Sequence, residues 1–406
     1  MKATPKGMRL QIGLFGRRNV GKSSLLNALT RQQVSIVSDV PGTTTDPVEK
    51  PMELLPLGPV LFIDTAGIDD VGALGQIRAE KTRLVFERTD LGIVVAAGDC
   101  WGEFEDSILA ELSKRQVPVM VVFNKTDLTP PTAEVVRKLE SGRIPWVQTA
   151  ATRGLGMLDL REALIRSAPE DFINTPSILG DLVPTGELVV LVVPIDLEAP
   201  RGRLILPQVQ SIRDILDNDS YCMVVKEREL RDALGRLKRP PALAVTDSQA
   251  FQSVTRIIPP QVPLTSFSIL FARLKGDLDE FVRGARAVDR LRSGDRVLVL
   301  ESCTHHPIGE DIGRVKIPRW LRQFTGADLE YVHMQGHDFP RDLTPYRLVV
   351  HCGSCMLNRR EVISRIVRCR EAAVPITNYG VVIAYSLGIL DRALSPFSGL
   401  SALLRK

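Results

Sequence analysis

The sequence predicts an α/β protein of three domains, each built around a largely parallel sheet. Three observations support this fold class. The chain has 406 residues, more than one small hydrophobic core accommodates. Short apolar runs that are typical of strands alternate with amphipathic runs that are typical of helices. Residues 169–187 are rich in proline and glycine, lack periodicity and therefore indicate a linker.

Composition limits the possible classes of protein. The 52 basic and 48 acidic residues leave a net charge of +4, which neither requires nor excludes nucleic acid. No run of like charge forms a polybasic strip, and we expect no nucleic-acid partner. Six cysteines are too few for a disulfide framework and favour metal or catalytic roles in a reducing compartment.

The N-terminal residues lack a long apolar core, so we expect no signal peptide. The most apolar late stretch, residues 374–394, contains Pro375, Asn378 and Asp391, and its unbroken part is too short to span a bilayer. We therefore expect a cytoplasmic protein without a membrane partner.

The first domain, expected over residues 1–170, starts with a strand over 10–15 that runs into a phosphate-binding loop. Its residues fit G-x-x-x-x-G-K-[ST], and an amphipathic helix follows; the matching residues are Gly16, Gly21, Lys22 and Ser23. Glycine lets backbone N–H groups converge on phosphate oxygens, and the positive end of the helix attracts the same anion. Lys22 would reach the outer phosphates, and Ser23 would ligate magnesium.

Three further motifs complete a guanine-nucleotide switch. In DTAG, Asp64 can hold the magnesium water shell, and Gly67 can offer its N–H to the γ-phosphate. In NKTD, residues 124–127, the Asp127 carboxylate can accept two hydrogens from the guanine edge, which adenine lacks. Thr44, in PGTTTD, can join the magnesium shell only while the γ-phosphate is present. The set predicts a P-loop domain that binds GTP rather than ATP.

These residues resemble the translation-factor-related GTPases, in the group that includes the tRNA-modification GTPase and the Era- and EngA-like ribosome-assembly GTPases. Residues 16–27 match the GRPNVGKSSLLN pattern of that group almost letter for letter. The resemblance implies that potassium replaces an arginine finger and that Asn19 ligates it. The loop that reads SA against the base aligns with Ala150 and Ala151, or alternatively with Thr149 and Ala150.

From these motifs we expect Lys22, Thr44 and Gly67 to act in catalysis, and Ser23 and Thr44 to ligate magnesium. Binding of GTP or GDP and its ions is assigned to Gly16, Asn19, Gly21, Lys22, Ser23, Ser24, Thr44, Asp64, Gly67, Asn124, Lys125, Asp127, Ala150 and Ala151.

The middle domain, expected over residues 171–262, has the pattern of a small parallel α/β sheet. Strand-like runs at 187–196, 221–226 and 242–248 alternate with helical runs at 206–217 and 227–238. It contains no phosphate loop, paired carboxylates or metal-ligand spacing. A core without visible chemistry is typical of an assembly module.

The last domain, expected over residues 263–406, repeats the alternation of strands and helices, and two of its strands end in cysteine and histidine. One gives C-x-H with Cys303 and His305; 45 residues later the other gives H-C-x-x-C with His351, Cys352 and Cys355. Because ligands of open parallel sheets bind at the carboxyl ends of strands, the two clusters can face one another.

The spacing leaves several chemistries open. Zinc could use three cysteines and one histidine as a closed structural site. A [4Fe–4S] cluster could use the three cysteines, with a fourth ligand from His305, His351 or Glu301, or an exchangeable one. A redox pair of thiols and histidines that are merely hydrogen-bonded are the remaining alternatives. Spacing alone does not separate zinc from iron–sulfur.

Over nearly its whole length the chain resembles the [FeFe]-hydrogenase maturation GTPases. The resemblance is carried by residues 193–217 in the middle domain and by 303–307, 351–361 and 374–385 in the last. It implies that the middle domain dimerises and that the last binds a [4Fe–4S] cluster. The implied ligands are Cys303, Cys352 and Cys355, with His305 or His351 as a possible fourth ligand.

The family implies a GTP-hydrolysing scaffold and carrier that is a homodimer or larger. Such a protein receives a transient two-iron cargo made with radical S-adenosylmethionine maturation enzymes and delivers it to apo-[FeFe]-hydrogenase. Its cofactors would be GTP/GDP, Mg²⁺, K⁺ and the [4Fe–4S] cluster. The rival hypotheses are a ribosome- or tRNA-associated GTPase with a structural zinc site and a GTP-regulated redox enzyme.

Overall fold

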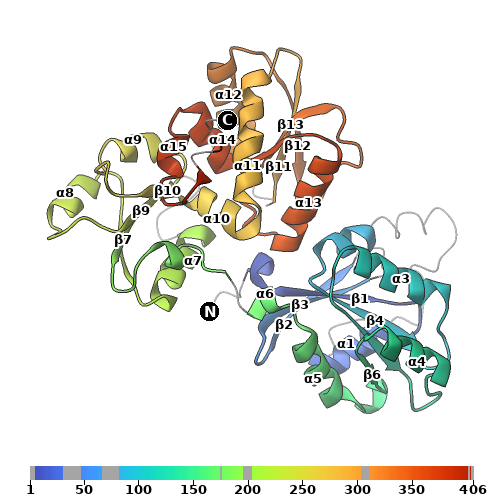
Figure 1. The fold of residues 1–406 in the computed structure, drawn as a ribbon. Helices are drawn as coiled ribbons and strands as arrows, with labels where there is room; N and C mark the ends of the chain where they lie inside the picture. Colours follow the sequence, from blue (N-terminus) through green and yellow to red (C-terminus); the bar gives the residue numbers. More distant parts are fainter. Residues whose placement is uncertain are drawn as a thin grey trace. The chain divides into compact units, whose positions relative to one another are not determined.

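The computed structural model describes residues 5–30, 47–65, 82–173, 176–194, 204–302, 311–400 and 403. The chain divides into two compact units, Met1–Thr175 and Pro176–Lys406 (Figure 1). The first unit holds one sheet and the second holds two, and nearly all of their neighbouring strands are parallel. This architecture confirms the predicted α/β fold class. Among the described helices, none combines the length and apolarity needed to cross a membrane.

The first unit contains a six-stranded sheet in the order β2-β3-β1-β4-β5-β6. Only β2, at one edge, is antiparallel to its neighbour. The strands are β1 Leu10–Phe15, β2 Val48–Leu54, β3 Gly58–Asp64, β4 Leu91–Ala97, β5 Val119–Asn124 and β6 Trp146–Gln148. Every residue of β1 is buried, as expected for a central parallel strand covered on both faces.

Helices cover both faces of this sheet. They are α1 Lys22–Thr30, the helix at 82–88, α3 Glu103–Lys114, α4 Ala133–Ser141, α5 Met157–Ser167 and α6 Glu170–Ile173. Leu25 of α1 and Leu160 of α5 belong to one apolar cluster, whereas Ile108 of α3 and Leu139 of α4 belong to another. The strands β3, β4 and β5 contribute side chains alternately to these two cores. This packing holds the carboxyl ends of β1, β3 and β5 at one edge, where the described nucleotide motifs begin.

The second unit contains two four-stranded sheets, in the orders β10-β9-β7-β8 and β12-β11-β13-β14, all of whose neighbouring strands are parallel. The first comprises β7 Leu188–Val192, β8 Tyr221–Val225, β9 Leu243–Thr246 and β10 Leu264–Ser266. The second comprises β11 Arg296–Glu301, β12 Glu330–Gln335, β13 Tyr346–His351 and β14 Ile376–Asn378. Because β10 pairs with β9, the first sheet extends beyond residue 262, the boundary expected from the sequence.

The helices of this unit alternate with its parallel strands along the chain, and the last two follow β14. They are α7 Leu206–Asp217, α8 Leu230–Gly235, α9 Phe251–Thr255, α10 Phe267–Lys275, α11 Leu278–Ala285, α12 Ile317–Thr325, α13 Arg359–Glu371, α14 Tyr379–Ser386 and α15 Leu390–Ala393, with a π-helical turn at Ile312–Lys316. Seven of the nine residues of α10 are buried. A helix that is apolar nearly all round belongs inside a core, and one hydrophobic cluster indeed includes α10 together with residues of both sheets.

The register of β11 and β13 positions the second candidate site. Leu300 of β11 pairs with His351 of β13, so the two strands end side by side. The N–H of Cys352 extends this pairing by donating to the Leu300 carbonyl at 3.0 Å. The segments that follow the two strands therefore leave the sheet at the same edge.

Candidate functional sites

The loop between β1 and α1 has the backbone that a phosphate-binding loop requires. Gly16 has φ of +150° and Gly21 has φ of +93°, a region that side-chain-bearing residues rarely adopt. A Cβ on Gly16 would lie 2.2 Å from the Val95 carbonyl oxygen, and one on Gly21 would lie 2.3 Å from Nδ2 of Asn124. Both positions therefore require glycine for conformation and for space.

The side chains expected to hold phosphate and magnesium have partners within the protein. Lys22 is buried, and its Nζ donates to the carbonyls of Gly16 and Arg17 at 2.8 Å each. Ser23 Oγ donates to Asp64 Oδ2 at 2.7 Å. Burial raises the pKa of Asp64, although the Ser23 hydrogen bond and the charge of Lys22 oppose that rise. The ligand-binding atoms are thus already assembled and satisfied by internal partners.

Asn124, at the end of β5, joins the phosphate loop to the loop that follows β6. Its Nδ2 donates to the Val20 carbonyl at 2.9 Å. Its Oδ1 accepts from Thr149 Oγ1 and from the Ala151 N–H, each at 3.1 Å. The amide therefore fixes the position of the expected base-binding segment relative to the phosphate loop.

The expected guanine-recognising carboxylate has an internal partner. Asp127 Oδ2 lies 3.0 Å from Nε of Arg153, in the 3-10 turn Ala151–Arg153. The Arg153 side chain is 62% exposed, so it can move away at small cost. Arg153 thus forms an ion pair with the carboxylate that is expected to bind guanine.

The remaining candidates of this site are only partly described. Asn19 has φ of +59°, as does Lys125. Ser24 lies in the first turn of α1 and is half-buried. Thr44 and Gly67 lie outside the described residues.

Sequence patterns missed one contact of the phosphate loop. Arg17 donates from Nε and Nη2 to the two carboxylate oxygens of Glu105, at 2.9 and 3.1 Å. Glu105 is fully buried and also accepts from the Gly102 N–H, which satisfies the start of α3. The two residues are 88 positions apart, and no motif links them. The bidentate pair ties the phosphate loop to the start of α3.

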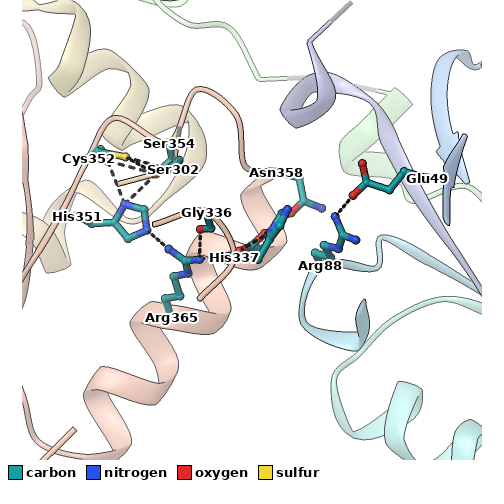
Figure 2. A network of polar contacts seen from close by, with 11 residues as sticks. Glu49, Arg88, Ser302, Gly336, His337, His351, Cys352, Ser354, Asn358 and Arg365 are labelled. Carbon is teal, nitrogen blue, oxygen red and sulfur yellow. Dashed lines mark hydrogen bonds and ion pairs between the residues drawn. The ribbon is translucent and has the colours of Figure 1, made fainter. Parts of the chain in front are cut away.

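The second candidate site lies at the ends of β11 and β13. Cys352 and Cys355 are half-buried. Ser302, the residue before Cys303, donates its N–H to Cys352 Sγ at 3.1 Å, and its Oγ lies 2.8 Å from the same sulfur (Figure 2). The structure therefore places the H-C-x-x-C loop in contact with the residue that precedes Cys303 in the sequence. Cys303 and His305 themselves lie outside the described residues.

His351 is engaged at both ring nitrogens. Its Nε2 lies 3.0 Å from Arg365 Nη1, and its Nδ1 lies 3.1 Å from the Cys352 carbonyl and 3.0 Å from Ser354 Oγ. Because a guanidinium only donates, Nε2 accepts and the ring proton is on Nδ1. Burial, and secondarily the charge of Arg365, lower the pKa of His351 to about 3. His351 is therefore neutral, with the Nε2 lone pair directed at Arg365 (Figure 2).

A polar network supports Arg365 from the other side. Arg365 Nη2 donates to Glu361 Oε1 at 2.7 Å and to the Gly336 carbonyl at 2.9 Å. The Glu361 carboxylate also lies 3.0 Å from Nδ1 of His337, whose side chain is partly exposed. The network leads from the surface to the backbone of the cysteine loop.

Among the residues that the structure describes, no group of three or more histidine, cysteine, aspartate or glutamate side chains is placed to hold a metal ion. The donor set nevertheless fits a soft metal centre. Cys352 and Cys355 lie on one loop. Ser302, which contacts Cys352, directly precedes a third cysteine in the chain. Thiolate ligands select zinc or iron–sulfur clusters over hard cations.

Comparison with known families divides the chain into three matched parts. Residues 178–276 match a family described as the hydrogen maturase F dimerization domain, and residues 279–396 match the hydrogen maturase F tetramerization domain. Residues 11–125 match a family described as 50S ribosome-binding GTPase. The N-terminal unit is therefore a GTPase domain.

Individual relatives match only part of this chain. The tRNA modification GTPase MnmE of Heliobacterium modesticaldum is 37% identical over 162 residues, which are 38% of this chain and 33% of that protein. The GTPase Der of Wolinella succinogenes is 35% identical over 169 residues, 39% of this chain and 35% of that protein. The chain thus matches about a third of the length of these relatives. Among solved structures, a variant of Aquifex aeolicus Era bound to GDP.AlF4- covers 61% of this chain and 97% of its own, at 17% identity and a TM-score of 0.36.

Proposed function

Because the chain belongs to the hydrogen maturase F family, we propose that it is a GTP-hydrolysing scaffold that carries a [4Fe–4S] cluster. In this role it receives a two-iron precursor from radical S-adenosylmethionine maturation enzymes and delivers it to apo-[FeFe]-hydrogenase. The two-iron unit is cargo, whereas the [4Fe–4S] cluster is the resident cofactor. The dimerization and tetramerization matches support a homo-oligomeric carrier.

The GTPase domain supplies the switch. When GTP binds, Lys22 would leave the Gly16 and Arg17 carbonyls and donate to phosphate oxygens instead. The Ser23 hydroxyl would leave Asp64 and ligate magnesium. Asp127 would leave Arg153 and accept hydrogen bonds from the guanine edge. Bound Mg²⁺ neutralises charge on the phosphates. By motif, Thr44 and Gly67 respond to the γ-phosphate, and Asn19 ligates potassium.

The contact between Ser302 and Cys352 carries the cluster assignment. It supports a common site for Cys303, which follows Ser302, and for the loop that holds Cys352 and Cys355. These three cysteines would hold the cluster. When bound, the cluster supplies one iron whose fourth ligand can be exchanged for cargo.

The hydrogen bonds of His351 support a positioning role for that residue. Its Nε2 accepts from Arg365, and its Nδ1 donates toward the Cys352 carbonyl, so ligation would break the buried contact with Arg365. The fourth ligand is then His305, Glu301 or an exchangeable group. Nitrogen couplings in the electron paramagnetic resonance of the reduced protein should be unchanged in His351→Ala; a coupling lost in that variant, and kept in His305→Ala, would refute this assignment.

GTP hydrolysis, in this proposal, alters partner affinity and leaves cluster retention unchanged. Lys22→Ala should therefore abolish hydrolysis at wild-type iron content. Cys352→Ser should show the reverse, with reduced iron and normal hydrolysis. Iron lost together with hydrolysis in Lys22→Ala would show that the two sites are not separable.

Metal analysis tests the cluster directly. Anaerobic purification and reconstitution should give close to four irons and four sulfides per chain, as the cluster formula requires. The rival hypothesis, a tRNA- or ribosome-associated GTPase with structural zinc, is motivated by the names of the relatives. It predicts a colourless protein that contains zinc and neither iron nor sulfide.

A further inference from the structure

Ser302 contacts the sulfur of Cys352, one of the proposed cluster ligands. Its N–H and its hydroxyl both lie within hydrogen-bonding distance of Cys352 Sγ, at 3.1 and 2.8 Å. We propose that Ser302 sets the reduction potential of the [4Fe–4S] cluster by donating two hydrogen bonds to the Cys352 thiolate. This inference rests on the proposed function, because it requires that Cys352 holds the cluster.

The direction of the second hydrogen bond follows from the chemistry of the ligand. A thiol can donate or accept, so the free cysteine leaves the roles of Ser302 Oγ and Cys352 Sγ open. A cysteine that ligates iron is a thiolate without a proton. The sulfur can then only accept, and the Ser302 hydroxyl must donate to it.

The surroundings make these hydrogen bonds effective. Ser302 is 6% exposed and Cys352 is half-buried, so water competes weakly for the sulfur. Hydrogen bonds to an ionised acceptor are about twice as strong as neutral ones, and low local polarity strengthens them further.

The backbone of Cys352 is fixed independently of Ser302. Its N–H donates to the Leu300 carbonyl, and its own carbonyl accepts from Asn378 Nδ2 at 3.2 Å and from Ser354 Oγ at 3.2 Å. His351 Nδ1 lies 3.1 Å from the same carbonyl oxygen. Removing the Ser302 hydroxyl should therefore leave the sulfur in place, with one donor fewer.

The sign of the effect follows from charge. Reduction adds one electron to the cluster and increases the negative charge on its sulfur ligands. Donors to sulfur stabilise that charge and so raise the reduction potential. Loss of the hydroxyl must lower the reduction potential. The backbone N–H of Ser302 remains in any substitution by another amino acid with a backbone N–H, so only one of the two hydrogen bonds is lost.

The test compares reconstituted wild-type protein with Ser302→Ala, Ser302→Thr and Ser268→Ala. Ser302→Thr keeps a hydroxyl. Ser268→Ala is the matched control, because Ser268 Oγ contacts Asn378 Oδ1 and the Gly380 N–H rather than sulfur. Iron and sulfide are counted, and the midpoint potential is measured by redox titration monitored by electron paramagnetic resonance.

We expect a more negative midpoint potential for Ser302→Ala at unchanged iron content, and wild-type values for Ser302→Thr and Ser268→Ala. Equal potentials in Ser302→Ala and wild type would overturn the inference and leave the proposed function intact. Ser302→Ala that loses its cluster but melts like wild type would also overturn it, because Ser302 would then serve retention. Wild-type protein that holds no iron–sulfur cluster would overturn the proposed function itself.

Discussion

Arg365 Nη1 donates to His351 Nε2 at 3.0 Å, and both side chains are almost completely buried. The same guanidinium neutralises Glu361, which is also buried. Because Cys352 follows His351 and the Cys352 carbonyl accepts from its ring, this contact connects helix α13 to the proposed cluster loop.

Replacing Arg365 should destabilise the second unit strongly. Arg365→Met removes the guanidinium from the buried carboxylate of Glu361 and from Nε2 of His351, at a cost of about 3–5 kcal/mol. The measurement is urea unfolding followed by Trp320 fluorescence, in a chain whose Trp101 and Trp146 are phenylalanine.

The matched control lies on the same helix. Arg370 pairs with Glu280, but its side chain is 59% exposed. Arg370→Met should cost less than about 1 kcal/mol. Equal costs for Arg365→Met and Arg370→Met would show that the buried network does not stabilise this unit.

His351 should make the stability of the cluster-free chain depend on pH. Burial and Arg365 lower its pKa from 6.5 to about 3. Between these values the unfolded chain binds a proton that the folded chain does not. The contribution of His351 to the free energy of unfolding is therefore complete above pH 6.5. It falls as the pH is lowered toward 3, by up to about 1.4 kcal/mol per pH unit.

His351→Gln isolates this effect. Glutamine can still accept from Arg365 through its carbonyl oxygen but does not titrate. Urea midpoints at pH 7 and pH 5 should differ more in the wild type than in His351→Gln. The same pH dependence in both chains would contradict a neutral, buried His351.

Asp64→Asn should stabilise the nucleotide-free GTPase domain while abolishing hydrolysis. Burial raises the pKa of Asp64, so its ionisation at neutral pH opposes folding. A neutral amide removes that cost, with a gain of about 0.5–2 kcal/mol, but it is a poor partner for magnesium-bound water. Thermal melting without nucleotide and a phosphate-release assay measure the two effects, and a lower melting temperature would contradict the account.

Arg153→Ala should strengthen binding of GDP. Arg153 forms an ion pair with Asp127, the residue proposed to bind the base, and an exposed ion pair contributes about 0.2–1 kcal/mol. Its removal should raise affinity about 1.4- to 5-fold. Arg166→Ala is the control, since Arg166 is 71% exposed and lies near Glu162. Titration with fluorescent GDP decides the matter; weaker binding by Arg153→Ala would mean that Arg153 helps to hold the nucleotide.

The sequence predicted the fold class and the strand ends because these features depend on local patterns. The apolar run before Gly16 is β1, and the run before Asp64 is β3. Parallel strands follow from the alternation with helices. The alternation did not predict β10, a strand of only three residues that directly precedes α10.

The contacts between distant residues were beyond the reach of sequence patterns. Ser302 meets Cys352 only because Leu300 pairs with His351, a register that no motif encodes. A single sequence also does not show which polar side chains are buried together. Arg365, for example, lies on a helix whose composition is typical of a solvated surface. Such partners are specified by tertiary packing rather than by local propensity.

We propose that this chain delivers a two-iron precursor to apo-[FeFe]-hydrogenase from a site that includes Cys352. The most direct measurement is hydrogen evolution after apo-hydrogenase is mixed with chain that has been loaded with the precursor. The account predicts activation by the wild type and by Arg370→Met, and none by Cys352→Ser. Loaded wild-type chain that leaves the apo-hydrogenase inactive would contradict it.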